Sequence, residues 1–193
     1  MSFSVCVYCG SRHGSRASYA AAARAVGTGI GQRGWQLVYG GGRVGLMGET
    51  ADAALAAGAR VVGVIPQTLR DREVGHLGLH ELHVVPTMHL RKQMMAERAD
   101  AFVALPGGIG TLEELYEVWT WRQLGYHDQP LGLLNVDGYY DDLLQFMSRS
   151  VDEGFLAPAQ HALLQVDSDP EALLERLHAL AADGGRDDDY SRI

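Results

Sequence analysis

Lysine is almost absent from the sequence. Lys92 is the only lysine, and 16 basic residues stand against 24 acidic ones, which gives a formal net charge of −8. Binding to nucleic acid or to an anionic membrane requires a basic patch, so this balance argues against both partners. An anionic small ligand is compatible with the sequence if a few basic residues create a positive field at its site. Lys92 lies directly beside Arg91, so these two residues could form such a group.

Long apolar runs are missing as well. No stretch approaches the roughly 20 apolar residues that a membrane-spanning helix needs. The N-terminus has no basic region followed by an apolar run and a cleavage site, so nothing in it indicates export. We therefore expect a cytoplasmic protein, and the 193 residues are enough for one domain with a sizeable core.

Cysteine is scarce, and its two copies are badly placed for a disulfide. Cys6 and Cys9 form a C-x-x-C pattern, which suggests redox or metal chemistry. They fall in an apolar stretch that reads as a strand, where this spacing puts the sulfurs on opposite faces and the Cα atoms about 10 Å apart. A disulfide tolerates at most ~7 Å, so we expect two buried free thiols.

Metal and serine-hydrolase patterns are lacking too. His80 and His83 lack the i, i+4 spacing of a zinc helix, and His89 beside Arg91 is a lone imidazole. The sequence contains no G-x-S-x-G nucleophile elbow. We expect neither a metal nor a cofactor.

What the sequence does contain is a regular alternation of apolar strands and helices. This pattern indicates a parallel sheet covered on both faces, so we predict a Rossmann-like, doubly wound α/β domain over 1–182 and a polar, disordered tail over 183–193. The predicted strands cover 3–9, 35–39, 60–65, 82–85, 101–105, 131–134 and 163–166. The predicted helices cover 15–32, 46–57, 88–99, 111–124, 139–153 and 170–182, and 67–80 is expected to be a surface loop.

One stretch, 101–114, is the strongest candidate for a site. Five apolar residues without alternation predict a strand buried on both faces, and Pro106 with three glycines then breaks it. Thr111 is a good helix cap, and the helix that follows carries apolar residues at i, i+3, i+4 and i+7. A strand, a glycine loop and a helix N-terminus together present unpaired N–H groups and a positive dipole, which favours phosphate binding over a simple tight turn.

The neighbouring charged residues each allow a second interpretation. Thr111 and Glu114 match a capping box, and spacing alone favours that structural role for Glu114 over a catalytic one. Arg91 and Lys92 follow the predicted cap Thr87, where they either form an ordinary exposed pair or clamp a phosphate or ribose. Parallel topology supports the functional roles, because all loops at the carboxyl ends of the strands meet at one edge. We expect convergence of the loops near 11, 40–45, 73, 87–92 and 106–114.

A second glycine loop matches the G-x-G-x-x-G dinucleotide fingerprint through Gly40, Gly42 and Gly45. It follows the second strand rather than the first, and the next strand ends in proline without an acid for a ribose. A phosphate contact or a tight packing turn is therefore the better interpretation. In the helix after 111, Trp119 and Trp121 lie on opposite faces, so we expect one in the core and the other over a base or an oligomer interface.

The two signature stretches, Met88-His89-x-Arg91-Lys92 and Pro106-Gly107-Gly108-x-Gly110-Thr111-x-x-Glu114, resemble the LONELY GUY family of nucleotide phosphoribohydrolases, long labelled possible lysine decarboxylases. The resemblance extends over nearly the whole chain, through 39–42, 45–48 and 132–140. It implies hydrolysis of the N-glycosidic bond of a cytokinin riboside 5′-monophosphate or of AMP, without a cofactor, by a homodimer whose site lies near the dimer interface.

The resemblance also assigns roles to particular positions. It implies that Arg91 and Glu114 are the catalytic pair. The substrate-binding residues that it implies are Glu73, Arg91, Lys92, Gly108, Ile109, Gly110, Thr111, Leu112, Glu113, Glu114 and Thr120. Candidate phosphate contacts, taken from the glycine loops and the first loop, are Ser11, Gly41, Gly42 and Gly107.

Two other functions compete with this one. A lysine decarboxylase would hold pyridoxal phosphate on Lys92, but no partner set for that cofactor accompanies it. A non-enzymatic nucleotide-binding or carrier module on the same fold is the stronger rival, because a fold by itself does not imply activity.

Overall fold

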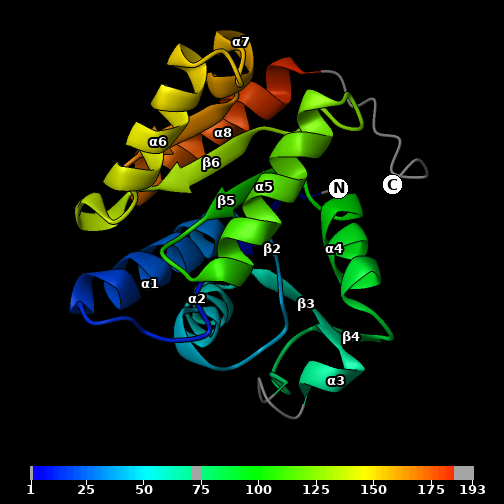
Figure 1. The fold of residues 1–193 in the computed structure, drawn as a ribbon. Helices are drawn as coiled ribbons and strands as arrows, with labels where there is room; N and C mark the ends of the chain where they lie inside the picture. The colour runs from blue at the N-terminus through cyan, green and yellow to red at the C-terminus, as the bar shows by residue number, and fades with distance from the viewer. Residues whose placement is uncertain (1, 71–74, 185–193) are drawn as a thin grey trace.

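The computed structural model describes residues 2–70 and 75–184 and contains a seven-stranded sheet in which all neighbouring strands are parallel. The strand order is β4-β3-β2-β1-β5-β6-β7, which confirms the predicted doubly wound class (Figure 1). The strands are β1 (Ser4–Tyr8), β2 (Gln36–Tyr39), β3 (Arg60–Pro66), β4 (Glu81–Val85), β5 (Ala101–Ala104), β6 (Leu131–Leu134) and β7 (Leu164–Asp167).

Helices cover both faces of the sheet, so the core is divided into two layers. The layer on one face is built with α1, α2 and α8, and the layer on the other face with α4, α5 and α6 (Figure 1). The helices are α1 (Ala17–Gln32), α2 (Gly45–Ala56), α3 (Gln67–Arg70), α4 (Met88–Glu97), α5 (Ile109–Gln123), α6 (Asp141–Asp152), α7 (Pro158–His161) and α8 (Pro170–Asp183), with a 3₁₀ turn at Val136–Gly138.

The sheet reverses its direction of winding between β1 and β5. These strands are neighbours, with Val5 opposite Ala101 and Tyr8 opposite Ala104. The chain leaves β1 toward α1 on one face and leaves β5 toward α5 on the other face. In doubly wound sheets such a switch point opens a crevice at the carboxyl ends of the two strands, which is where ligands bind.

The two cysteines lie where the strand spacing placed them. Cys6 packs into the layer with α4 and α5, whereas Cys9 packs into the layer with α1 and α2. Both are buried free thiols. Burial in apolar surroundings raises the pKa of each thiol well above its ordinary value.

Several local predictions need correction. Helix α5 begins at Ile109, and its N-cap is Gly108, three residues before the predicted cap Thr111. Glu114 is therefore too far along the helix for a capping box. The segment expected to be a loop contains α3, and the short helix α7 was not predicted. The cap on α4 is confirmed, because the Thr87 side chain accepts a hydrogen bond from the Leu90 N–H.

The tryptophan prediction is wrong, since both indoles are in the core. Trp119 and Trp121 are each less than a tenth exposed and belong to the same apolar layer. The indole N–H of Trp119 donates to the carbonyl of Gln160 in α7 at 3.0 Å. Helix α5 is therefore covered on more than one side, and neither ring is available for a base.

Two predictions concern residues that lie partly or wholly outside the described ranges. Glu73 falls in 71–74, outside the described residues, as does the predicted tail from 185 onward. Within the described parts of the chain, no helix is both long and apolar enough to cross a membrane.

Candidate functional site

Arg91 and Glu114 meet above the carboxyl edge of the sheet. Nη1 of Arg91, in the first turn of α4, lies 4.0 Å from Oε1 of Glu114, in the second turn of α5. Their side chains are only 5% and 11% exposed. Two opposite charges in a largely water-excluded position interact more strongly than a surface pair, because less solvent screens them.

The backbone fixes the guanidinium of Arg91. Its Nε donates to the carbonyl of Val64 in β3 at 3.1 Å, and its Nη2 donates to the carbonyl of Gly40, just after β2, at 3.0 Å. Glycine at position 40 leaves room for this bond, since a Cβ there would lie 2.0 Å from Nη2 and the guanidinium would have to move. The first glycine of the apparent dinucleotide fingerprint thus makes room for an arginine.

The loop after β1 joins the other two loops of the crevice. The Gly10 N–H donates to the carbonyl of Pro106 at 3.1 Å, and the Gly10 carbonyl accepts from the N–H of Leu46, the second residue of α2, at 3.0 Å. Gly45 has φ +58°, and a Cβ there would lie 2.3 Å from the backbone nitrogen of Arg12. The second glycine loop therefore packs tightly against the first loop.

The glycine loop before α5 presents the start of a long helix to the crevice. Gly107 packs so closely that a Cβ would lie 2.0 Å from Oγ1 of Thr111. The first N–H groups of an α-helix have no partner within the helix, and they carry its positive dipole end. The local geometry therefore suits an anion, and phosphate binding at this loop stays a prediction.

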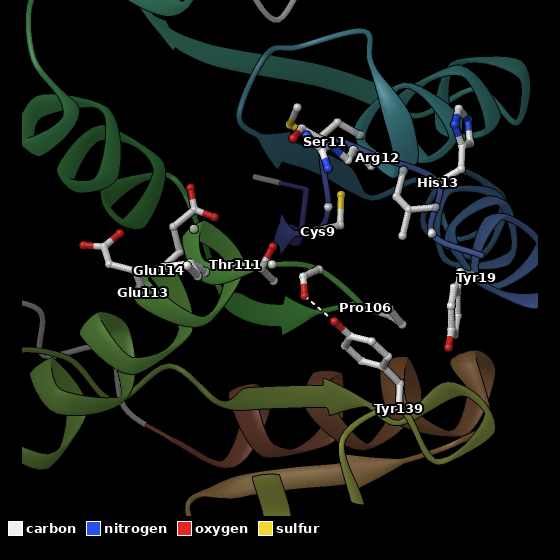
Figure 2. Close-up of a pocket in the computed structure, with 18 of the residues that line it drawn as sticks. Cys9, Ser11, Arg12, His13, Tyr19, Pro106, Thr111, Glu113, Glu114 and Tyr139 are labelled. Carbon is white, nitrogen blue, oxygen red and sulfur yellow. Dashed lines mark hydrogen bonds between the residues drawn. The ribbon is translucent and has the colours of Figure 1, made fainter. Parts of the chain in front are cut away.

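These elements enclose a cavity of about 690 Å³ (Figure 2). Figure 2 shows Glu113, Glu114 and Thr111 from α5 on one side, and Tyr19 and Tyr139 on the other. The predicted site residues that line the cavity are Ser11, Arg91, Gly107, Gly108, Ile109, Gly110, Thr111, Glu113 and Glu114.

Lys92 does not line the cavity. Its Nζ donates to Oε1 of Glu113 at 2.5 Å and to Oε1 of Glu117 at 2.9 Å, and these bonds join α4 to α5. Burial disfavours the charge of Lys92, but the hydrogen bonds to the two carboxylates outweigh burial and raise its pKa. Lys92 thus connects the helices that carry Arg91 and Glu114.

Four other predicted residues also lie outside the cavity lining. The hydroxyl of Thr120 donates to the carbonyl of Tyr116 at 2.7 Å. Leu112 packs against the apolar layer that is built with α4, α5 and α6. Gly41 and Gly42 contact the segment after α3, where the Gly41 carbonyl accepts from the N–H of His76 and Gly42 forms a bridge with Gly75.

Several lining residues had no predicted role. They come mainly from the loop after β1, from α2 and from the segment before α6, and include Arg12, His13, Tyr19, Met47, Met88 and Tyr139. The sequence already placed the loop after β1 at this edge through Ser11, and the switch point between β1 and β5 is the signal that could have added the other side chains of that loop. Tyr139 belongs to a stretch on which the family resemblance rests, but no chemistry was attached to it.

A metal centre has no support in the described ranges, 2–70 and 75–184, where no cluster of three or more His, Cys, Asp or Glu side chains could hold an ion. The polar groups that line the cavity are instead two guanidinium groups (Arg12 and Arg91), two carboxylates (Glu113 and Glu114), the imidazole of His13, the hydroxyls of serine, threonine and tyrosine side chains, and the backbone of the glycine loop. This set suits an anionic organic ligand.

Comparison with known proteins identifies the family. A family model described as "Possible lysine decarboxylase" matches residues 47–177. Cytokinin riboside 5′-monophosphate phosphoribohydrolase LOG1 of Arabidopsis thaliana is 51% identical over 168 residues, 86% of this chain and 79% of that protein. The chain belongs to the LONELY GUY (LOG) family. Arabidopsis LOG4, which carries the same enzyme name, is 53% identical over 153 residues, 79% of this chain and 71% of its own.

Solved structures share the LOG-type fold at much lower identity. The Moco carrier protein of Chlamydomonas reinhardtii superposes with a TM-score of 0.73 at 21% identity, covering 95% of this chain and 100% of that one. The molybdenum cofactor binding protein of Rippkaea orientalis gives 0.70 at 20% identity, covering 93% and 98%. At these identities the likeness shows the fold alone.

Proposed function

We propose that this LOG-family protein is a nucleoside 5′-monophosphate phosphoribohydrolase. It hydrolyses the N-glycosidic bond of cytokinin riboside 5′-monophosphates, of AMP, or of both, and releases the free base and ribose 5-phosphate. The observation that carries the proposal is the position of Glu114 beside Arg91, in the cavity that also contains the N-terminus of α5. Relatives about 50% identical carry this enzyme name.

The N-terminus of α5 binds the 5′-phosphate. Its unpaired N–H groups and dipole favour a dianion, and the three glycines leave the backbone uncovered. Binding energy gained at the phosphate, away from the bond that breaks, orients the ribose in the cavity. This assignment uses Gly108, Ile109, Gly110 and Thr111 as donors, with Ser11 nearby.

Glu114 acts at the sugar. Breaking the bond between C1′ and the base nitrogen gives an oxocarbenium-like state with positive charge on the ribose, which a fixed carboxylate stabilises. The carboxylate also accepts a proton from the attacking water, whose oxygen bonds to C1′, while the base leaves with the electron pair and takes up a proton from solvent. Arg91 positions Glu114 and the sugar, because its own guanidinium is fixed by β3 and Gly40.

A lysine decarboxylase is not favoured by the state of Lys92. Pyridoxal phosphate chemistry needs a lysine amine that becomes neutral and reaches the cofactor. Lys92 has a raised pKa and donates to two carboxylates outside the cavity lining. The only lysine of the chain is therefore held in its charged form by α5.

The carrier alternative is not favoured either. The molybdenum cofactor proteins that share the fold are about 20% identical, whereas the named phosphoribohydrolases are about 50% identical over most of the chain. The cytoplasmic location and the homodimer stay predictions, and light scattering on the purified protein would measure the oligomeric state.

The deciding experiment measures adenine release from AMP and isopentenyladenine release from isopentenyladenosine monophosphate. Glu114→Gln keeps the size of the side chain and removes its charge, so we expect release to fall by about 100-fold or more while AMP still binds. Glu97→Gln in α4, whose carboxylate accepts from Gln93, is the matched control and should keep wild-type rates. Binding without release in the wild type would instead support the carrier module.

A further inference from the structure

Two adjacent tyrosines, Tyr139 and Tyr140, form hydrogen bonds to the glycine loop before α5 and to the residue that follows β5. The hydroxyl of Tyr139 donates to the carbonyl of Gly107 at 2.6 Å, the bond drawn in Figure 2, and the hydroxyl of Tyr140 donates to the carbonyl of Leu105 at 2.7 Å. Tyr140 is buried, whereas Tyr139 lines the cavity and is partly exposed. The loop that precedes α5 is thus supported by a segment about 30 residues further along the chain, and the reaction described above uses neither tyrosine.

The segment that carries these tyrosines has hydrogen bonds and ring contacts of its own. The side chain of Asn135 accepts from the Tyr140 N–H at 2.8 Å and donates to the Asp141 carboxylate at 2.7 Å. Asp137, the only described non-glycine residue with positive φ, has φ 51° at the 3₁₀ turn just before Tyr139. The ring of Tyr139 packs edge-on against Tyr19 at 5.5 Å, which limits its rotation.

The bond to Gly107 fixes the orientation of the peptide that links Gly107 to Gly108. In a trans peptide the C=O and the following N–H point in opposite directions, and the described residues contain no cis peptide bond. When Tyr139 holds the Gly107 carbonyl, the Gly108 N–H must point away from the tyrosine. Gly108 is the N-cap of α5, so its N–H is the first donor of the helix terminus.

The peptide that Tyr139 orients lies between two consecutive glycines. Gly107 and Gly108 lack the Cβ atoms that restrict other residues, so the peptide between them can rotate more easily than an ordinary one. A Cβ at Gly108 would meet nothing within 4 Å, so no other part of the protein packs against that side of Gly108. A rotated peptide would turn the Gly107 carbonyl oxygen, rather than the Gly108 N–H, toward a bound phosphate.

We propose that Tyr139 is a positioning residue for phosphate binding, acting through the peptide between Gly107 and Gly108. Its hydroxyl holds the loop in the conformation that donates to a phosphate before the ligand arrives. This inference deepens the proposed function and rests on it for the identity of the substrate. It adds a residue that contacts the loop and not the reacting sugar.

The test compares Tyr139→Phe with Tyr116→Phe. The first variant loses only the hydroxyl that holds Gly107. The second loses a hydroxyl that bonds to the sulfur of Met147 at 3.1 Å, away from the cavity lining. We expect Tyr139→Phe to weaken inorganic phosphate binding and to raise KM for AMP by roughly three- to tenfold, the usual net worth of one hydrogen bond. Binding of adenosine, which lacks the phosphate, and kcat should change less than twofold, and Tyr116→Phe should match the wild type.

An independent readout follows the loop itself. Titration of inorganic phosphate into ¹⁵N-labelled wild-type protein should shift the Gly108 amide resonance, and the shift should be smaller in Tyr139→Phe at equal saturation. The inference is overturned if phosphate affinity is unchanged in Tyr139→Phe, or if adenosine binding weakens as much as AMP binding. If the wild type binds phosphate but hydrolyses neither nucleotide, the proposed function fails, while the phosphate measurements still decide the role of Tyr139.

Discussion

Nη1 of Arg91 lies 4.0 Å from Oε1 of Glu114, while Nε and Nη2 of the same guanidinium donate to the carbonyls of Val64 and Gly40. The arginine therefore connects three elements: β3, the loop after β2, and α5. At 4.0 Å these two atoms interact through charge rather than through a direct hydrogen bond. The guanidinium of Arg91, which backbone carbonyls of β3 and of the loop after β2 fix in position, therefore attracts the carboxylate of Glu114 to this place.

The variant Arg91→Lys should distinguish the effect of the guanidinium's directional hydrogen bonds from the effect of its positive charge. An ammonium group cannot donate in the directions that the planar guanidinium serves, so at least one of the two buried carbonyls loses its partner. We expect a loss of stability of about 1–3 kcal/mol. We also expect kcat/KM for the nucleotide to fall by about 100-fold or more, an effect in the range of a displaced catalytic group. Urea unfolding and adenine release measure the two effects.

Arg60→Lys is the matched control. Arg60 forms an exposed ion pair with Glu81 at the other end of β3. Exposed pairs contribute little to stability, so this variant should unfold within about 0.5 kcal/mol of the wild type and keep its activity. Wild-type activity in Arg91→Lys would show that a positive charge at this position suffices and that the directional bonds do not matter.

Much of the fold followed from local sequence signals, and the exceptions have physical causes. Apolar runs predicted the five inner strands, because parallel strands in the middle of a sheet are buried on both faces and show no alternation. The edge strands β4 and β7, which are only partly buried, were predicted from shorter stretches that include a polar residue. The start of α5 was predicted two residues late. A side-chain cap at Thr111 was the visible signal, whereas the helix begins after Gly108 in an extended conformation that leaves no mark in the side chains.

The candidate site could be predicted only in part, because topology tells which loops meet and not where each side chain points. Arg91 and Glu114 lie in helices that begin at the same edge of the sheet, and the structure brings them together. Lys92, one residue along α4, is turned by about 100° around the helix and meets Glu113 and Glu117 instead. The contact of Tyr139 with Gly107 spans 32 residues, and no spacing rule reveals it.

Alanine at Gly110 should stabilise the protein and weaken substrate binding. Gly110 lies in the first turn of α5, and a Cβ there would meet nothing within 4 Å, so alanine should raise stability by about 0.5–1 kcal/mol through its helix propensity. Gly110 also lines the cavity, and the added methyl group would occupy space proposed for the phosphate. Thermal unfolding should move upward while KM for AMP rises.

Alanine at Gly107 is the contrasting variant. Its Cβ would lie 2.0 Å from Oγ1 of Thr111, so we expect a loss of about 1–3 kcal/mol from overpacking together with weaker binding. The pair of variants therefore moves stability in opposite directions and affinity in the same direction. An unchanged KM for AMP in Gly110→Ala would place the phosphate somewhere other than the first turn of α5.

The two buried thiols should make the protein less stable in alkali. Burial raises the pKa of Cys6 and of Cys9, whose thiol also lies in the field of Glu114, whereas in the unfolded chain both thiols ionise near pH 8.5. A raised folded-state pKa gives a stability contribution that is complete below pH 8.5 and is lost as the pH rises beyond it. Each thiol should therefore lower the free energy of unfolding by up to about 1.4 kcal/mol per pH unit in that range.

The measurement is urea unfolding at pH 7.5 and pH 9.5 for the wild type and for the double variant Cys6→Ala and Cys9→Ala. Other groups that titrate in this range, such as the tyrosines, are the same in both proteins, so the difference between the two pH dependences belongs to the thiols. The wild type should lose more stability between the two pH values than the double variant does. Equal losses would mean that the thiols ionise as easily in the folded protein as in the unfolded chain, which would place at least Cys9 in contact with water through the cavity that it lines.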